Sequence, residues 1–437
     1  MGDDDFGGLD SAVELAGVRV FHGDCRDVLR ELPDNSVDSI VTDPPYELGF
    51  MGKKWDSSGI AYDPAVWGEC LRVLKPGGHL LAFGGTRTWH RLAVAVEDAG
   101  FEIRDNIAWM YGSGFPKSLD VSKAIDKTLG AEREVIGQTS KARSSSGKSA
   151  LPTVGGSTVY ETWDETAPAT PEAQKWQGWG TALKPAFEPI VVARKPLTGT
   201  VAGNVLEWGT GGLNIDGSRI VGTVEPVAGT KRSGGIMGES SPRENPTEPH
   251  AAGRWPANVI LDEYTAQLLD EQSGVSVSKT GMRGSLSAEG SHEGWKRESH
   301  KGFNTLRGHN DSGGASRFFY VAKASKRDRN EGLEDLPEQV GQRTHDGGED
   351  TRGRPLPANR NIHPTVKPTA LMRYLVKLVT PPGGTVLDPF TGSGSTGKAA
   401  ILEGFEFVGV ELTEDYLPII EGRLKWALEN RKEDTLF

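Results

Sequence analysis

The residues best suited to chemistry form the segment Asp43-Pro44-Pro45-Tyr46, directly after the apolar run 39–41. The exocyclic amine of adenine or cytosine is a weak nucleophile because its lone pair is delocalised into the ring. The Asp43 carboxylate and the Pro44 carbonyl can accept both N–H bonds of such an amine, while Tyr46 stacks on a base swung out of a duplex. Two prolines fix these acceptors, so less ordering is needed at reaction. The segment therefore predicts a site that holds a nucleobase amine for attack, although an ordinary turn explains the same residues equally well.

A second segment, 388–397, has the layout of a nucleoside-binding turn. It follows an expected buried strand at 385–387 and precedes an expected helix, and Glu411 ends the next expected strand. Glycines in such a turn let the backbone approach a ligand, and the helix start offers free N–H groups. A carboxylate at the end of the second strand can accept both ribose hydroxyls. A plain glycine turn with Asp388 as a helix cap does not explain two acids at successive strand ends.

Three ligand classes fit this turn, and the neighbouring residues separate them. The spacing from Gly392 to Lys398 fits a phosphate-binding loop, but Ala399 replaces the magnesium-binding hydroxyl and Asp388 would repel phosphate. The Gly-x-Gly-x-x-Gly spacing fits a dinucleotide but leaves the Asp43 segment unexplained. S-adenosylmethionine has no pyrophosphate and carries a sulfonium and an ammonium, which makes Asp388 favourable. The residues therefore favour S-adenosylmethionine as the donor for an in-line methyl transfer that needs no metal.

Composition limits the classes of protein that the chain can belong to. Its 437 residues carry a net charge of −11, so a polyanion would have to meet a local basic patch. Cys25 and Cys70 cannot form a disulfide framework and have no metal-ligand spacing, which indicates a reducing compartment and no structural zinc. The acidic N-terminus lacks a signal core, and no apolar run is long enough to span a bilayer. We therefore expect a cytoplasmic protein with no membrane partner.

The elements that must position these residues alternate between strand and helix. The expected strands are 18–22, 39–41, 79–83, 101–110, 385–387 and 405–410, and the expected helices are 27–32, 64–74, 87–99, 369–379, 398–403 and 415–429. This alternation predicts a parallel sheet covered on both faces. The middle of the chain, 111–361, is rich in Gly, Ser, Thr, Pro and Arg and shows only scattered strand-like runs.

Several motifs in this order resemble the amino-group DNA methyltransferases that act on N6 of adenine or N4 of cytosine. The order, with the catalytic motif before the cofactor motif, resembles their permuted beta group. Residues 43–46 match the catalytic motif and 388–395 match the cofactor motif. Residues 363–368 match the segment that closes over the methionine end of the cofactor, and Gly23-Asp24 matches an acid near the cofactor adenine. The resemblance covers roughly 18–111 and 361–437. Residues 208–214 and 254–258 also resemble bacteriophage members of the group.

The resemblance implies a fold, a cofactor and a set of site residues. The fold is α/β: a doubly wound, mostly parallel, seven-stranded Rossmann-like sheet with a large loop-rich insertion, in which strand 385–387 lies beside strand 39–41. The cofactor is S-adenosylmethionine, and no metal site is implied. The implied catalytic residues are Asp43, Pro44 and Tyr46. The implied cofactor-binding residues are Asp24, Asp43, His363, Thr365, Lys367, Asp388, Phe390, Gly392, Gly394, Ser395 and Glu411.

The domain organisation follows from the same resemblance. Residues 1–111 and 361–437 form the two halves of the catalytic domain, 112–185 is an insertion, 186–198 returns as an antiparallel strand, and 199–360 is the target-recognition region. Within the last of these, residues 279–329 hold 11 Lys and Arg against 5 Asp and Glu, interleaved with aromatic residues. Such a mixture suits a DNA backbone and unstacked bases, although a solvated basic loop has the same composition.

Double-stranded DNA is therefore the expected partner. A homodimer is the candidate assembly. Adenine N6 is the first expected target because the catalytic motif begins with Asp, and cytosine N4 is the runner-up. A catalytically inactive DNA-binding relative and a methyltransferase for RNA or a protein glutamine amide are further alternatives. The expected compartment is the bacterial cytoplasm, or that of a host if the gene is carried by a phage.

Overall fold

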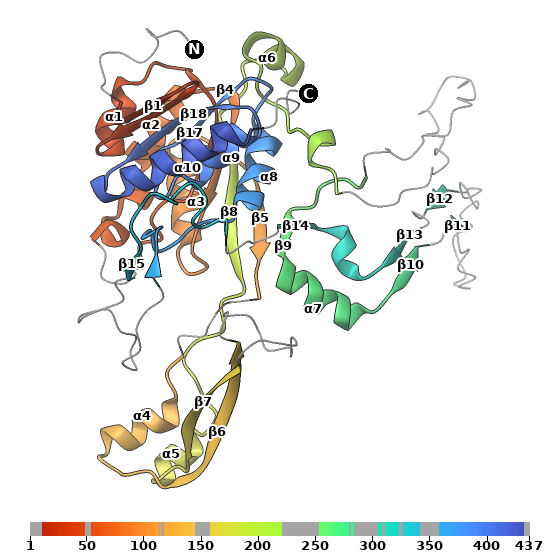
Figure 1. Cartoon of the computed structure of the whole chain (residues 1–437). Coiled ribbons are helices and arrows are strands. Elements are labelled where there is room, and N and C mark those ends of the chain that lie inside the picture. Colours follow the sequence, from red (N-terminus) through yellow and green to blue (C-terminus); the bar gives the residue numbers. More distant parts are fainter. Residues whose placement is uncertain are drawn as a thin grey trace. The chain divides into compact units, whose positions relative to one another are not determined.

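The computed structural model describes residues 11–48, 54–112, 114, 118–144, 158–220, 253–278, 281–283, 305–307, 311–322, 327–340 and 358–431. It divides into two compact units, one formed by Met1–Gly112 with Phe187–Phe437 and the other by Ser113–Ala186 (Figure 1). All the candidate site residues lie in the first unit.

The first unit is built on one mixed sheet of ten strands. In spatial order these are β1 (Val13–Leu15), β2 (Val18–His22), β18 (Glu406–Glu411), β17 (Thr385–Asp388), β3 (Val37–Thr42), β4 (Leu74–Phe83), β8 (Phe187–Arg194), β5 (Glu102–Met110), β9 (Val259–Asp262) and β14 (Tyr320–Ala322). The pairs β1–β2, β4–β8 and β8–β5 are antiparallel, and the other six neighbouring pairs are parallel.

The prediction of an α/β fold with a mostly parallel sheet is confirmed, but seven strands is too few. The seven strands from β2 to β5 in the spatial order form the expected arrangement, with β8 as the antiparallel return strand. Strand β1 adds to one edge because Gly17, with φ of 70°, allows a tight hairpin into β2. Strands β9 and β14 extend the other edge from within the middle of the chain, where the sequence showed only short apolar runs.

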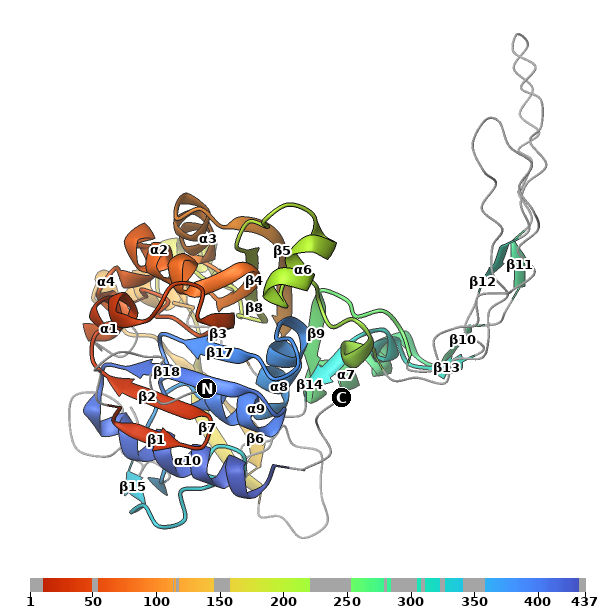
Figure 2. The ribbon, with the colours of Figure 1, turned by 90° about the horizontal axis from the view of Figure 1, so that it is seen from above.

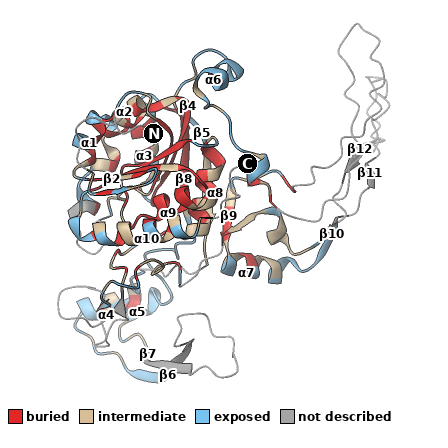
Figure 3. Ribbon diagram, turned by 45° about the horizontal axis from the view of Figure 1, so that its top comes forward, coloured by how far each residue is buried: buried red, intermediate tan, exposed pale blue. Residues whose placement is uncertain are grey.

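Helices cover both faces of this sheet (Figure 2). On one face, α1 (Cys25–Glu31), α2 (Pro64–Val73) and α3 (Trp89–Asp98) contribute to one apolar core. On the other, α8 (Thr369–Val379), α9 (Ser395–Leu402) and α10 (Leu417–Glu429) contribute to a second core. Successive strand residues alternate between the cores, as when Ile40 faces the first and Val41 the second. The central strands are therefore buried on both sides (Figure 3).

The expected neighbours β17 and β3 are confirmed, with Val386 beside Ser39 and Leu387 beside Ile40. Because these strands are parallel, their carboxyl ends meet at one edge of the sheet. Thr42 at the end of β3 donates from Oγ1 to Oδ1 of Asp388 at the end of β17, at 2.6 Å. The two motifs, far apart in the chain, are therefore joined directly by a buried hydrogen bond.

One local prediction differs from the structure. Residues 75–78 separate the expected helix 64–74 from the expected strand 79–83, but in the structure they lie inside β4. Leu74 pairs with Val37 and His79 pairs with Ser39, so the intervening residues of β4 form a wide bulge against β3. Gly77 takes the left-handed turn conformation within this bulge, with φ of 78°. The turn is present, but the sheet continues on both sides of it.

The remaining described elements lie outside this core. The first unit also contains α6 (Val201–Trp208), α7 (Glu263–Ser273), and the strand pairs β10 (Ser276–Ser278) with β13 (Asp311–Gly313), β11 (Gly281–Arg283) with β12 (Thr305–Arg307) and β15 (Gln339–Val340) with β16 (Ala358–Asn359). Short 3-10 turns occur at Lys54–Ser57, Ile60–Tyr62, Asp216–Ser218, Ala315–Phe318 and Glu414–Tyr416. Among the described helices, none is long and apolar enough to cross a bilayer.

The second unit is a β-hairpin with two short helices. Strands β6 (Val135–Ser144) and β7 (Thr158–Thr166) pair antiparallel, beside α4 (Val121–Thr128) and α5 (Pro171–Lys175). The buried Asp126 carboxylate accepts from Arg133 Nη1 at 2.6 Å and from the backbone N–H groups of Ala169 and Thr170. This one carboxylate fastens the end of the hairpin to both helices.

Candidate active site

The catalytic loop begins where β3 ends and is held from several sides. The Tyr46 carbonyl accepts hydrogen bonds from Thr88 Oγ1 at 3.0 Å and from Tyr62 Oη at 3.2 Å. A Cβ added at Gly85 would lie 3.3 Å from the Tyr46 ring, so the glycine leaves room for that ring. Pro44 is buried and Asp43 is partly buried. The loop is therefore fixed before any ligand arrives.

Asp43 has one fixed oxygen and one unpaired oxygen. Its Oδ2 accepts from Lys367 Nζ at 2.7 Å. Its Oδ1 is buried and has no hydrogen-bond partner in the part of the chain that the structure describes. A buried acceptor without a donor is unfavourable unless a ligand supplies one. Among the described residues, Asp43 Oδ1 is therefore an acceptor that is left without a donor.

Lys367 connects the catalytic loop to a residue that the sequence did not reveal as part of the site. Its Nζ lies 3.1 Å from Tyr46 Oη and 3.2 Å from Oε2 of Glu188, and Tyr46 Oη donates to the same Glu188 oxygen at 2.9 Å. Burial would lower the pKa of Lys367, but the Asp43 and Glu188 carboxylates outweigh it and raise this pKa. Burial, aided by these carboxylates, raises the pKa of Tyr46, so the phenol keeps its proton. Lys367 thus remains a cation between two anions.

Glu188 could have been found from the expected return strand. An antiparallel strand starts at the edge where its parallel neighbours end, so an acid at the start of 186–198 must lie near the catalytic loop. Glu188 directly precedes the apolar run 189–193, and a single acid before a strand is not by itself a signal of a site.

Two buried acids lie in the expected cofactor half of the site. Asp388 Oδ1 accepts from the Phe390 backbone N–H at 3.1 Å as well as from Thr42. Glu411 accepts from the backbone N–H groups of Gly392 and Thr413, both at 2.7 Å. Burial raises the pKa of each carboxyl to about 6. Within the described residues, neither acid forms an ion pair.

The glycine turn packs closely against the segment expected to close over the cofactor. Gly392 has φ of 56° and Gly394 has φ of 74°, values that favour glycine. A Cβ at Gly392 would lie 3.0 Å from His363 Nε2. His363 Nδ1 lies 2.7 Å from the Thr365 carbonyl, which can only accept, so Nδ1 carries the proton and Nε2 is the acceptor. Burial lowers the pKa of His363 to about 4, which keeps the ring neutral.

The other expected cofactor residues take different positions. Ser395 begins α9, and its hydroxyl accepts from Arg423 Nη1 at 3.0 Å. The Phe390 ring lies 6.3 Å from that of Trp67. Thr365 is exposed and contacts His363 through its carbonyl. Asp24 caps α1 and accepts from the backbone and side chain of Arg26, which lowers its pKa.

Asp24 nevertheless lies at the same sheet edge as the other acids. Gly23 N donates to the Glu411 carbonyl at 3.0 Å, because β2 and β18 are parallel neighbours. The structure therefore brings the ends of β2, β18, β17 and β3 together along this edge.

Lys398, which matched a phosphate-binding loop in spacing, is fully buried. Its Nζ lies 2.9 Å from both Asp328 Oδ1 and Glu331 Oε2. This ammonium is therefore engaged by two carboxylates, which argues against the phosphate interpretation. Among the described residues, no cluster of three or more His, Cys, Asp or Glu side chains could hold a metal ion.

The chemistry of the residues at this sheet edge fits S-adenosylmethionine. Buried acids without a resident cation suit a ligand that carries positive charge and ribose hydroxyls. The left-handed glycines give the backbone a close approach to such a ligand. Asp388, Glu411 and the turn 392–395 would hold this cofactor, beside Asp43.

Comparisons with known proteins extend these observations. The model of the N6/N4 methyltransferase family, described as DNA methylase, matches residues 37–422. The chain is 44% identical over 66 residues to the type II methyltransferase M.ScaI of Streptomyces caespitosus, covering 15% of this chain and 22% of that protein. It is 40% identical over 72 residues to the DNA adenine methyltransferase YhdJ of Escherichia coli strain K12, covering 16% and 24%. The matched stretches thus span about a quarter or less of these relatives.

Solved structures are similar at low identity. A complex of M1.HpyAVI with SAM matches at 14% identity and a TM-score of 0.37, covering 93% of this chain and 98% of that one. The PvuII DNA methyltransferase, described as cytosine-N4-specific, matches at 12% identity and a TM-score of 0.43, covering 95% and 89%. With a family model that matches most of its length, the chain belongs to the DNA methylase family of N6/N4 methyltransferases.

Proposed function

We propose that this chain methylates the exocyclic N6 amine of adenine in double-stranded DNA, with S-adenosylmethionine as the donor. The observation that carries the proposal is the Asp43 carboxylate, with Oδ2 held by Lys367 and a buried Oδ1 left as an acceptor. This arrangement supports recognition of a neutral N–H donor next to a cofactor pocket.

The residues divide the work of the reaction. S-adenosylmethionine, when bound, supplies an activated methyl carbon on its sulfonium. Asp43 Oδ1 and the Pro44 carbonyl accept the two amine N–H bonds, which pulls the nitrogen toward tetrahedral geometry and frees its lone pair. Lys367 keeps the Asp43 carboxylate in place, so little reorganisation is needed. Asp43 is also the base proposed to take the proton that the amine loses as the methyl group passes from sulfur to nitrogen.

Tyr46 is the proposed stacking partner of the flipped base. Its hydroxyl is occupied by Glu188, and its raised pKa keeps it neutral. A neutral ring whose hydroxyl is already anchored offers its face to a base at low cost in side-chain entropy.

The cofactor pocket is proposed to consist of Asp388, Glu411, His363 and the turn 392–395, with Asp24, Thr365, Lys367 and Phe390 around it. Glu411 is proposed to accept from the ribose hydroxyls, as its place at the end of β18 supports. The proposed target-recognition region is 199–360. Most of its basic segment 279–329 lies outside the described residues, but Phe318 is 40% exposed with the guanidinium carbons of Arg317 and Arg254 at 4.4 Å and 4.8 Å from its ring centroid. An exposed ring beside two guanidiniums suits contact with DNA.

Product analysis tests the proposed base. The protein is incubated with unmethylated genomic DNA and S-adenosylmethionine carrying a labelled methyl group, and the DNA is digested to nucleosides. N6-methyldeoxyadenosine is the expected labelled product. Labelled N4-methyldeoxycytidine would show that the target base is cytosine and not adenine, while the proposed methylation of an exocyclic amine would stand. Label in RNA or protein substrates, with none in DNA, would refute the proposed substrate class.

A further inference from the structure

A segment that no motif includes lies against the cofactor half of the site. Residues 327–336, here called the strap, run between β14 and β15 without regular secondary structure. We propose that the strap is a positioning element of the cofactor site, which holds both the glycine turn and the His363 segment in their binding arrangement. This inference rests on the proposed function, because it assigns the strap a role in binding the same cofactor.

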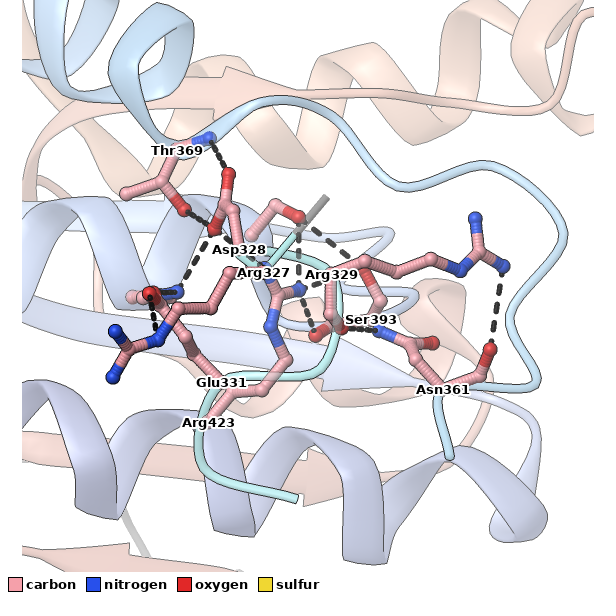
Figure 4. Close-up of polar contacts among 10 residues, drawn as sticks. Arg327, Asp328, Arg329, Glu331, Asn361, Thr369, Ser393 and Arg423 are labelled. Carbon is pink, nitrogen blue, oxygen red and sulfur yellow. Dashed lines mark hydrogen bonds and ion pairs between the residues drawn. The ribbon is translucent and has the colours of Figure 1, made fainter. Parts of the chain in front are cut away.

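Asp328 of the strap contacts residues of three helices, α8, α9 and α10 (Figure 4). It accepts from the backbone N–H of Thr369 at 2.7 Å and from the Thr369 hydroxyl, at the start of α8. It also accepts from Lys398 Nζ of α9 at 2.9 Å and lies 3.7 Å from Arg423 Nη2 of α10. One carboxylate thus joins the three helices on this face of the sheet.

The charges of this cluster balance only when the strap is in place. Lys398 and Arg423 are fully buried, and the strap supplies Asp328 and Glu331 against them. A buried cation without an anion is strongly unfavourable. Lys398 and Arg423 therefore need the carboxylates of the strap. The same ion pairs hold the strap against α9 and α10.

Arg423 connects Asp328 to the glycine turn 392–395. Its Nη1 donates to the Ser393 carbonyl at 2.7 Å and to the hydroxyls of Ser393 and Ser395, each at 3.0 Å. Ser393 lies between the two left-handed glycines of the turn. Asp328 therefore neutralises the side chain that fixes the backbone of the cofactor turn.

Arg329 connects the strap to the His363 segment, on the other side of the proposed cofactor site. Its Nη2 donates to the His363 carbonyl, and Nη2 lies 3.3 Å from the Asn361 carbonyl. Asn361 donates from Nδ2 to the Arg329 carbonyl at 2.9 Å and accepts from the His363 backbone N–H at 3.1 Å. His363 in turn faces Gly392. Neighbouring strap residues thus reach both walls of the proposed pocket.

The backbone of the strap is fitted to α10. A Cβ at Gly332, whose φ is 83°, would lie 2.5 Å from the Gly422 carbonyl, and a Cβ at Gly422 would lie 2.4 Å from the Gly332 carbonyl. Leu333 is fully buried in the apolar core. Such close packing indicates that the strap is a packed part of the fold and not a loose surface loop.

The test measures cofactor affinity in strap variants of the full chain by isothermal titration calorimetry with S-adenosylmethionine. Asp328→Asn removes the charge and keeps the shape. Glu334→Gln is the matched control, because Glu334 is an exposed acid of the same strap. We expect Asp328→Asn to weaken binding roughly tenfold or more and to raise the KM for the cofactor in parallel. With saturating cofactor, kcat should stay within about twofold of wild type, a split that a general loss of folded protein would not produce.

Thr369 provides a second pair of variants if Asp328→Asn does not fold. Thr369→Val deletes the hydroxyl that donates to Asp328, and Thr369→Ser keeps it. We expect Thr369→Val to weaken cofactor binding and Thr369→Ser to bind as wild type does. Folded variants that lack these contacts but bind the cofactor like wild type would overturn the role of the strap. A wild-type protein that binds no S-adenosylmethionine would instead refute the proposed function, and the strap role with it.

Discussion

The two halves of the candidate site hold their carboxylates in opposite ways. In the catalytic half, Asp43 and Glu188 share a resident cation, Lys367. In the cofactor half, Asp388 and Glu411 accept hydrogen bonds from hydroxyl and backbone N–H groups, and burial raises the pKa of both. The difference matches the proposed ligands. The neutral nucleobase would contact Asp43, whose charge Lys367 already balances, whereas the cationic cofactor would contact Asp388 and Glu411, which form no ion pair among the described residues.

Substitution of Asp43 should give the largest difference between the two halves of the site. Asp43→Ala should lower kcat by about 10³-fold or more, because the oriented acceptor acts on the amine in the transition state. Cofactor affinity should fall by no more than about tenfold, because the cofactor acids remain. Rates of label transfer to duplex DNA and calorimetry on the same sample measure the two effects. Asp27→Asn, at an exposed acid of α1, is the control, and equal losses of binding and transfer would contradict the division of labour.

Lys367 tests whether the resident cation orients Asp43. Lys367→Met leaves two carboxylates together without a cation, and kcat should fall about 10- to 100-fold. Lys367→Arg keeps the charge and should recover part of the rate, although the guanidinium cannot reproduce the ammonium geometry. Single-turnover methylation with saturating cofactor measures the effect. A Lys367→Met protein with the wild-type rate would show that Asp43 needs no fixed partner.

Glu411 tests the cofactor half by itself. Glu411→Gln should weaken S-adenosylmethionine binding by about tenfold, since one of its backbone donors then faces an amide NH₂ group and the charge is lost. At saturating cofactor, kcat should remain near that of wild type. Titration calorimetry and initial rates separate these outcomes, with the exposed Glu414→Gln as the control. A fall in kcat with unchanged affinity would place Glu411 in the chemical step instead.

The pH dependence of binding gives a smaller effect with a defined sign. Asp388 and Glu411 have pKa values raised to about 6, so both are largely ionised at pH 7.5 and gain protons as the pH falls through 6. A cationic ligand prefers the ionised acids, so affinity should fall several-fold between about pH 7.5 and 5.5. Because Gln does not titrate, Glu411→Gln should show a shallower fall. Identical pH profiles for the two proteins would contradict the assignment.

The sequence was enough to predict that the segments after β3 and β17 meet at one edge of the sheet, but not which other residues surround them. The permuted motif order predicted that β17 and β3 are neighbours, because glycine turns and strand-end acids sit at fixed places in such folds. Glu188 was missed because its importance follows from strand direction, which the sequence does not show. Asp328 was missed because one acid in a stretch of mixed charge has no periodic signal, and its partners come from three helices that are distant in sequence. The runs 258–261 and 318–321 were strand-like in the sequence and largely correspond to β9 and β14, but their sequence did not show that they join the main sheet.

The central claim is that residues from opposite ends of the chain form one site with separable acceptor and donor halves. The most direct measurement compares Asp43→Ala and Glu411→Gln side by side for cofactor binding and for methyl transfer to duplex DNA. The account predicts that Asp43→Ala binds S-adenosylmethionine but transfers no measurable methyl group, while Glu411→Gln binds weakly and transfers normally once the cofactor is saturating. Methyl transfer by Asp43→Ala at the wild-type rate would contradict it.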